Sequence, residues 1–146
     1  MSKNQKGFTL VESLLVLSIF MIISSITAFT LQPQHFVLED KAFISQLRSD
    51  LLYSQQYAIS HQHEVSILIQ PDQYRYYVLA NTDRPPILER NYSTNIYLIE
   101  GTLPLYFKFL PDGNVNKVGT FFIQTKKKNY RVIFLIGMGR FYVTEQ

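Results

Sequence analysis

Hydrophobic and polar residues follow three different patterns along the chain, and the first pattern is an uncharged apolar run. Between Glu12 and Glu39 there is no Asp, Glu, Lys or Arg, and apolar residues fill most of that window. Residues 8–31, as a helix rising about 1.5 Å per residue, would reach across a hydrocarbon core of about 30 Å. We therefore expect residues 8–31 to form an apolar helix of membrane-spanning length.

The second pattern has a helical period and follows Pro33. Proline lacks an N–H and clashes with the preceding turn, so we expect the first helix to end or kink there. The next stretch, residues 32–63, predicts an amphipathic helix, because apolar residues recur at spacings of seven, three and four. The expected apolar face comprises Val37, Ile44, Leu47, Leu51 and Ala58. The polar residues expected largely off this face are Asp40, Gln46, Arg48, Asp50 and Gln55.

The third pattern begins after His63 and has a period of two, which is typical of strands. A strong turn signal of Pro, Asp, Gly and Asn occupies residues 111–114, and residues 81–86 have the composition of a loop. One long helix followed by consecutive antiparallel strands predicts an α+β fold, with an antiparallel β domain at residues 64–146. The expected strands are 65–69, 74–78, 96–99, 105–109, 121–125, 130–136 and 140–144.

Composition excludes several classes of chemistry. The chain has no cysteine, so it can form no disulfide, thiolate metal site or cysteine nucleophile. It also carries no phosphate-binding loop and no nucleophile elbow, so we expect neither an enzyme nor a cofactor. His61 and His63 lack a third ligand at a sensible spacing beyond Glu64. A polar helix end, where histidine suits the negative pole of the helix dipole, is favoured over a metal site.

Positive charge is concentrated in the C-terminal third. The net charge is +3, but the chain from Gly101 onward has seven Lys and Arg residues and only two acidic residues, Asp112 and Glu145. Such an excess favours a polyanion, and aromatic neighbours could stack on bases. The alternative is a set of solvated turns and strand edges, where lysine discourages aggregation. The candidate DNA contacts are Lys126, Lys127, Lys128, Arg131 and Arg140.

The N-terminal segment has three interpretations. A cleaved signal peptide fits poorly, because the apolar run is too long and no small-residue cleavage site follows it. A plain signal anchor fits the length, with Lys3 and Lys6 on the cytoplasmic side. It leaves Glu12 unexplained, however, since a charge costs about 2.5–3.5 kcal/mol at the centre of a membrane helix.

The third interpretation rests on residues 7–12, GFTLVE, which follow Lys6 and lead directly into the apolar run. This segment resembles the type III signal of type IV pilins and pseudopilins. The resemblance implies that residues 1–7 are a prepilin leader, that a membrane peptidase cleaves between Gly7 and Phe8, and that Phe8 is then N-methylated. It also implies that Glu12 pairs with the N-terminal amine of a neighbouring subunit during assembly. Pairing makes a charge in an apolar bundle tolerable.

The second half of the chain extends the resemblance. Residues 109–114 (FLPDGN), 119–123 (GTFFI) and 139–143 (GRFYV) resemble segments of minor pilins and H-type pseudopilins. Some of those proteins bind DNA through Gly-Arg-x-Arg, but Tyr142 stands where the second arginine belongs. With the short leader and the cysteine-free domain, the chain is most similar to the ComGD-type minor pilins of Gram-positive competence pili.

That resemblance implies a pilin-like fold and a subunit that starts or caps a filament used in DNA uptake. The implied partners are other major and minor pilins, the prepilin peptidase and the cytoplasmic membrane, with DNA as a further candidate. The implied location is the bacterial cytoplasmic membrane, with the N-terminus in the cytoplasm, and the cell surface after assembly. Two alternatives stay open: an H-type pseudopilin of a type II secretion system, and a pilus-mounted DNA-binding subunit.

Overall fold

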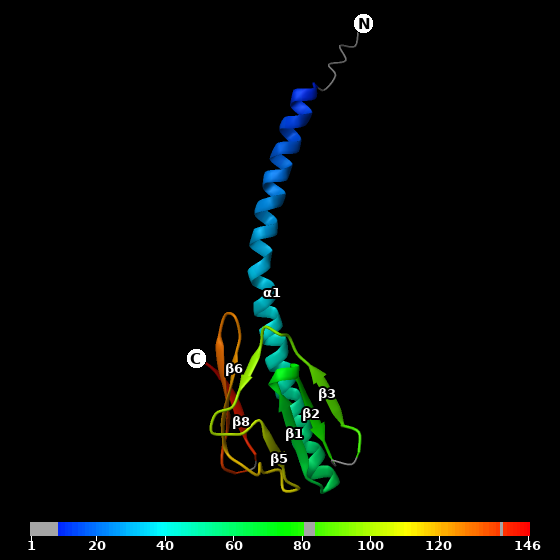
Figure 1. Ribbon diagram of the computed structural model, residues 1–146, viewed down its shortest axis with the longest axis vertical. Helices are drawn as coiled ribbons and strands as arrows, with labels where there is room; N and C mark the ends of the chain where they lie inside the picture. The colour runs from blue at the N-terminus through cyan, green and yellow to red at the C-terminus, as the bar shows by residue number, and fades with distance from the viewer. Residues whose placement is uncertain (1–8, 81–83, 138) are drawn as a thin grey trace. The chain divides into compact units, whose positions relative to one another are not determined.

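The computed structural model describes residues 9–80, 84–137 and 139–146 (Figure 1). The chain divides into two compact units, Met1–Leu38 and Glu39–Gln146. The structure does not describe residues 1–8, residues 81–83 or Met138. Residues 81–83 belong to the loop that the sequence predicts at residues 81–86. The elements of the second unit form the α+β fold that the sequence predicts.

A single helix, α1, runs from Leu10 to His61 and is 52 residues long. Thr9 caps its N-terminus, because the Thr9 Oγ1 atom accepts a hydrogen bond from the Glu12 N–H at 3.3 Å. The helix ends where Gln62 adopts a left-handed φ of 54°, a common way to leave a helix. The predicted helix end at Pro33 is therefore wrong: α1 continues through that position. One proline removes one helical hydrogen bond, whereas a second helix would need a new and costly nucleus.

The strands of the second unit form two antiparallel four-stranded sheets. The first sheet has the order β3-β2-β1-β5, and its strands are Leu88–Asn91, Arg75–Leu79, Val65–Gln70 and Tyr106–Phe109. The second has the order β4-β6-β7-β8, and its strands are Tyr97–Ile99, Gly119–Gln124, Asn129–Phe134 and Phe141–Glu145. A short 3₁₀ helix, η1, occupies Pro71–Gln73 between β1 and β2. The sequence located seven of these strands to within two residues, but it missed β3, whose charged sequence LERN carries no alternating pattern.

The hydrophobic core of the second unit combines one face of α1 with aromatic residues from both sheets. Leu47, Leu51 and Ala58 are at most 2% exposed, as the helical period predicts, and Ile44 is half-buried. Val37 lies outside the side chains that the structure describes. Phe107 on β5 meets Phe134 on β7 with ring centroids 5.1 Å apart, which joins the two sheets.

Two acidic residues of α1 contradict the predicted polar face. Asp40 and Asp50 are only 4% and 5% exposed, although the sequence analysis placed them largely off the apolar face. Asp40 lies seven residues before Leu47, so it shares that side of the helix. Burial of each carboxylate is offset by hydrogen bonds from other elements: Thr125 bonds Asp40, and Tyr76 and Arg90 bond Asp50.

Candidate processing and assembly segment

The structure describes only the residues that follow the predicted processing site. Gly7 and Phe8 lie outside the described residues, and the described chain begins at Thr9. Glu12 is the third residue of α1, with an exposed side chain. The spacing of Thr9 and Glu12 is that of a capping box, and a carboxylate suits the positive pole at a helix N-terminus. Among the described residues no Lys, Arg or His forms an ion pair with Glu12.

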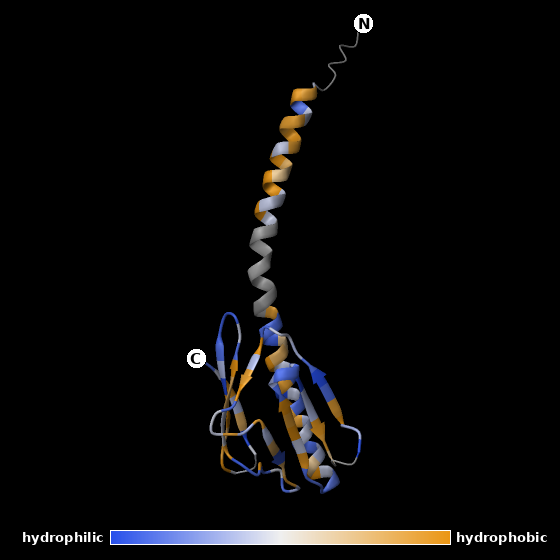
Figure 2. Cartoon of the chain, viewed as in Figure 1, coloured by the Kyte–Doolittle hydropathy of each residue, from blue (hydrophilic) through white to orange (hydrophobic). Residues whose placement is uncertain are grey.

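The apolar helix that follows Glu12 is long enough to cross a membrane. The window Leu10–Thr27 has 18 residues, meets the length and composition of a membrane span, and has no residue buried against the rest of the described chain. Leu10 is 76% exposed and Phe20 67%. Hydrophobic residues dominate the first turns of α1 in Figure 2. Such an uncovered apolar surface needs lipid or another apolar chain around it.

Three hydroxyl groups within this window donate to carbonyls of the helix itself. Ser18 donates to the Leu15 carbonyl at 2.8 Å, and Ser25 donates to the Met21 carbonyl at 2.9 Å. Thr27 donates to the Ile23 carbonyl at 2.9 Å. These bonds remove the cost of placing hydroxyls in an apolar surrounding. Glu12 is the one ionisable side chain of the window, and it requires a partner from elsewhere.

The three candidate lysines form the turn between β6 and β7. Thr125 organises this turn: its Oγ1 atom donates to the buried Asp40 carboxylate at 2.6 Å and accepts the N–H of Lys127 at 3.3 Å and of Lys128 at 3.2 Å. The Lys128 ammonium group lies 2.5 Å from the Glu145 carboxylate on β8, and this bond raises the pKa of Lys128. We call Lys126, Lys127 and Lys128 the lysine turn.

The two candidate arginines lie apart from each other. The Arg131 guanidinium on β7 stands 5.7 Å from the centroid of the Phe122 ring on β6, within reach of a cation–π contact. Arg140 is in the turn between β7 and β8. Because β7 has six residues, the lysine turn and Arg140 lie at opposite ends of a strand of about 20 Å. The structure therefore does not gather the five candidate DNA contacts into one surface.

Residues 109–114 and 139–143, two of the segments that resemble minor pilins, contact each other and α1 at the other end of the second sheet. Gly113 and Gly139 both have left-handed φ, of 80° and 56°. The Gln55 side chain of α1 donates to the Gly113 carbonyl at 2.8 Å, and a Cβ atom on Gly139 would collide with that same carbonyl. Residues 109–114 and 139–143 thus meet on α1, a proximity that the sequence does not reveal.

The histidine pair forms a polar helix end. His61 is the last residue of α1, and its ring stacks on Tyr57 with centroids 3.9 Å apart. His63 lies just beyond and is exposed. In the described part of the chain, no three His, Asp or Glu side chains are grouped closely enough to hold a metal ion.

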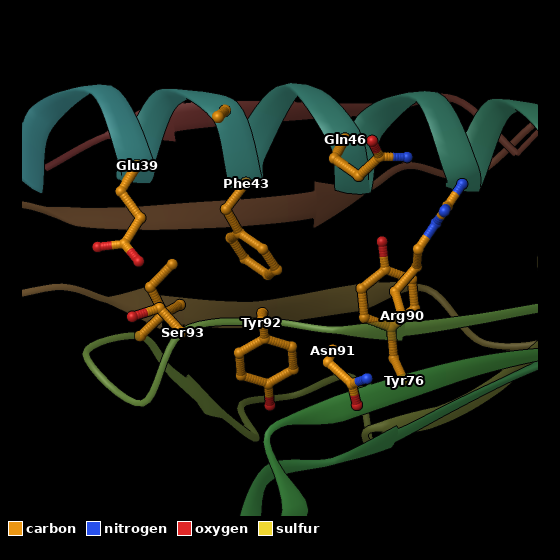
Figure 3. Close-up of a pocket in the computed structure, with 10 residues that line it drawn as sticks. Glu39, Phe43, Gln46, Tyr76, Arg90, Asn91, Tyr92 and Ser93 are labelled. Carbon is orange, nitrogen blue, oxygen red and sulfur yellow. The ribbon is translucent and has the colours of Figure 1, made fainter. Parts of the chain in front are cut away.

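An open pocket of about 350 Å³ lies between α1 and the chain around β3 (Figure 3). Phe43 and Gln46 of α1 face Tyr92 and Arg90 across it. Beside the pocket, the Asp50 carboxylate accepts hydrogen bonds from the Tyr76 hydroxyl at 2.7 Å and the Arg90 Nε atom at 3.1 Å. Sequence reasoning missed this group of three; its only signal was an acid seven residues after the buried Phe43. The Asp50 carboxylate is engaged in these bonds, so the group joins elements rather than presenting a reactive side chain.

Known proteins resemble this chain both in its N-terminal segment and along nearly its whole length. Residues 2–28 match the family model of the prokaryotic N-terminal methylation motif. Competence protein ComGD of Bacillus subtilis (strain 168) is 33% identical over 137 residues, which cover 94% of this chain and 92% of that protein.

Two solved structures share the fold at low identity. The type IV minor pilin FimU of Pseudomonas aeruginosa (strain PAO1) gives a TM-score of 0.61 at 16% identity, covering 71% of this chain and 91% of that one. The minor pseudopilin EpsH from the type 2 secretion system of Vibrio cholerae gives 0.59 at 18% identity, covering 73% and 97%. The predicted pilin-like α+β fold is thereby confirmed.

Proposed function

The chain belongs to the ComGD family of competence proteins, and we propose that it is a minor pilin whose leader is removed between Gly7 and Phe8 before assembly. In this proposal residues 8–31 first anchor the subunit in the cytoplasmic membrane and then join the apolar bundle of a competence pilus. Its partners are the prepilin peptidase and other major and minor pilins. Lys3 and Lys6 keep the N-terminus in the cytoplasm, and the assembled subunit lies at the cell surface.

The arrangement at Glu12 is the observation that carries this function. Glu12 is an exposed carboxylate in the first turn of an exposed apolar helix, with Thr9 capping that turn. Cleavage before Phe8 would create a positive amine four residues from Glu12. When subunits pack helix against helix, the amine of one can pair with the carboxylate of its neighbour, and their attraction offsets part of the cost of desolvating both charges.

The secretion alternative shares this physics. FimU and EpsH match the fold almost equally, with TM-scores of 0.61 and 0.59, so the fold does not separate pilus from pseudopilus. The similarity to ComGD along nearly the whole chain favours the competence pilus. Deleting the chain should abolish transformation in its native cell and leave protein secretion intact; the reverse result would favour the pseudopilus. Direct DNA contact and the absence of enzyme activity both stay predictions.

Substituting Gly7 tests processing. Gly7→Leu should leave the leader attached, because a bulky side chain before the scissile bond hinders close approach of the peptidase to the backbone. Intact-mass measurement of the membrane-extracted protein would report the leader and the N-methyl group. Asn4→Leu, an equally bulky change inside the leader, should be processed normally. A mature N-terminus at Phe8 in the Gly7 variant would contradict the cleavage assignment.

Substituting Glu12 tests assembly separately. Glu12→Ala should be processed normally but should assemble poorly, because removing one partner of a desolvated ion pair costs about 3–5 kcal/mol. Sheared pilus fractions and transformation frequency would measure the loss. Glu39→Ala removes the next carboxylate along the chain and should keep both near wild type. Normal pili with Glu12→Ala would refute the pairing role and leave the processing assignment standing.

A further inference from the structure

The second sheet is held on α1 at two separate points. At one point Asp40 of α1 accepts the hydroxyl of Thr125, directly before the lysine turn. At the other, Gln55 of α1 holds the Gly113 carbonyl, against which Gly139 packs. Fifteen helical residues separate Asp40 from Gln55, which is about 22 Å. The lysine turn and Arg140 are therefore fixed at opposite ends of this unit.

The lysine turn lies at the end of the unit at which the chain arrives from the apolar segment. Nine residues separate residue 31, where the apolar run ends, from Asp40. So short a stretch limits how far the Asp40 end of the second unit can lie from the apolar segment, whatever the arrangement of the two units. Charges attract over about one Debye length, which is about 8 Å in physiological salt.

The lysine turn has a backbone held by hydrogen bonds and exposed lysine side chains. The buried Asp40–Thr125 bond and the two N–H groups that Thr125 accepts hold its backbone. The side chains of Lys126 and Lys127 are exposed, and so is Lys41 on the adjoining turn of α1. The Glu145 carboxylate nearby is engaged by Lys128. The exposed side chains of Lys41, Lys126 and Lys127 give this end of the unit a positive charge that favours an anionic surface.

We propose that the lysine turn docks the second unit of the unassembled subunit onto anionic lipid headgroups of the membrane that holds residues 8–31. The inference rests on the membrane insertion proposed above. Lipid is favoured over DNA as the polyanion, because the tether keeps this turn beside the membrane while Arg140 lies at the far end. Docking would keep the domain at the membrane until a filament takes up the subunit.

The full chain reconstituted into vesicles tests the proposal. Since the chain has no cysteine, one fluorophore can be placed at Asn129→Cys beside the lysine turn, or at His63→Cys at the far end. Energy transfer to a headgroup-labelled lipid should be stronger from position 129 when phosphatidylglycerol is mixed into phosphatidylcholine. The double variant K126Q/K127Q should lower the docked-to-undocked ratio roughly fivefold per lysine. The matched variant K117Q/R140Q, with the same charge loss at the other end, should not.

Three results would overturn the inference: equal transfer in purely zwitterionic vesicles, equal loss in the matched variant, or loss of duplex DNA binding in K126Q/K127Q with no response to lipid charge. The last would identify DNA as the polyanion. Flotation with vesicles after an alkaline wash tests membrane insertion of the chain separately from docking of the lysine turn. A chain that fails to float contradicts membrane insertion and hence the proposed function, whereas a chain that floats without docking contradicts only this inference.

Discussion

Asp50 is a buried carboxylate that accepts a hydrogen bond from Gln46 on its own helix and two more that tie α1 to the first sheet. Its Oδ2 atom accepts from Tyr76 on β2 and from Arg90 on β3, an edge strand of that sheet. Arg90 itself is partly exposed, so its ion pair with Asp50 is screened on one side. The Tyr76 hydroxyl is buried, and burial together with the neighbouring Asp50 raises the pKa of Tyr76. Most of the stabilisation therefore comes from satisfying buried groups.

Removing that carboxylate should destabilise the domain. Asp50→Ala leaves the buried Tyr76 hydroxyl without an acceptor, which costs about 1–3 kcal/mol of unfolding free energy. Chemical denaturation of the detergent-solubilised chain, followed by tyrosine fluorescence, would measure it. Asp72→Ala removes an exposed carboxylate and should change stability little. Adding Tyr76→Phe to Asp50→Ala should recover part of the loss; strict additivity of the two substitutions would show that the bond contributes nothing.

At the scale of elements, α1 and the glycine turns show where local pattern and tertiary demand differ. The helical period predicted a helix over residues 32–63. The local rule for Pro33 predicted an end or a kink at that position, and α1 does not end there. The turn glycines follow their local rule, since Gly137 and Gly139 both have left-handed φ. Their surroundings differ: no atom lies within 4 Å of a Cβ at Gly137, whereas a Cβ at Gly139 meets Gly113 and Gln55.

The two glycines should therefore respond differently to alanine. Gly137→Ala should cost about 1–2 kcal/mol, the price of a left-handed backbone for an L-residue. Gly139→Ala should cost more, because it adds a collision that forces the turns on α1 apart. Thermal unfolding of both variants in parallel gives the comparison, with each serving as the other's control. Equal losses would mean that the junction of Gln55, Gly113 and Gly139 adapts freely.

At the scale of the whole molecule, the buried Tyr76 and the half-buried Tyr92 predict alkaline sensitivity. Burial raises the pKa of Tyr92 to about 12 and that of Tyr76 further, while tyrosines in an unfolded chain ionise near pH 10. A raised pKa in the folded state means that their contribution to stability is complete below about pH 10 and is lost as pH rises through about 12. The free energy of unfolding should fall across that window.

Denaturation at successive pH values, with tyrosinate absorbance recorded in parallel, would measure the fall. The double variant Y76F/Y92F should flatten it, because phenylalanine cannot ionise. Tyr97→Phe, at a position 51% exposed, should leave the fall unchanged. An unchanged alkaline fall in Y76F/Y92F would assign it to other groups.

The sequence alone was sufficient for the apolar N-terminal helix, the order of the long helix and the strands, and the likeness to minor pilins. Its apolar length and the position of Glu12 near its start depend on residues adjacent along the chain, so a linear pattern contains them. Only the tertiary structure decided the roles of Asp40 and Asp50, the division into two sheets and the separation of the lysine turn from Arg140. Thr125, which bonds Asp40, is 85 residues away from it, and Tyr76, which bonds Asp50, is 26 residues away. Burial of a polar group costs free energy unless another group forms a hydrogen bond with it, and the local sequence does not show which distant residue will be that partner.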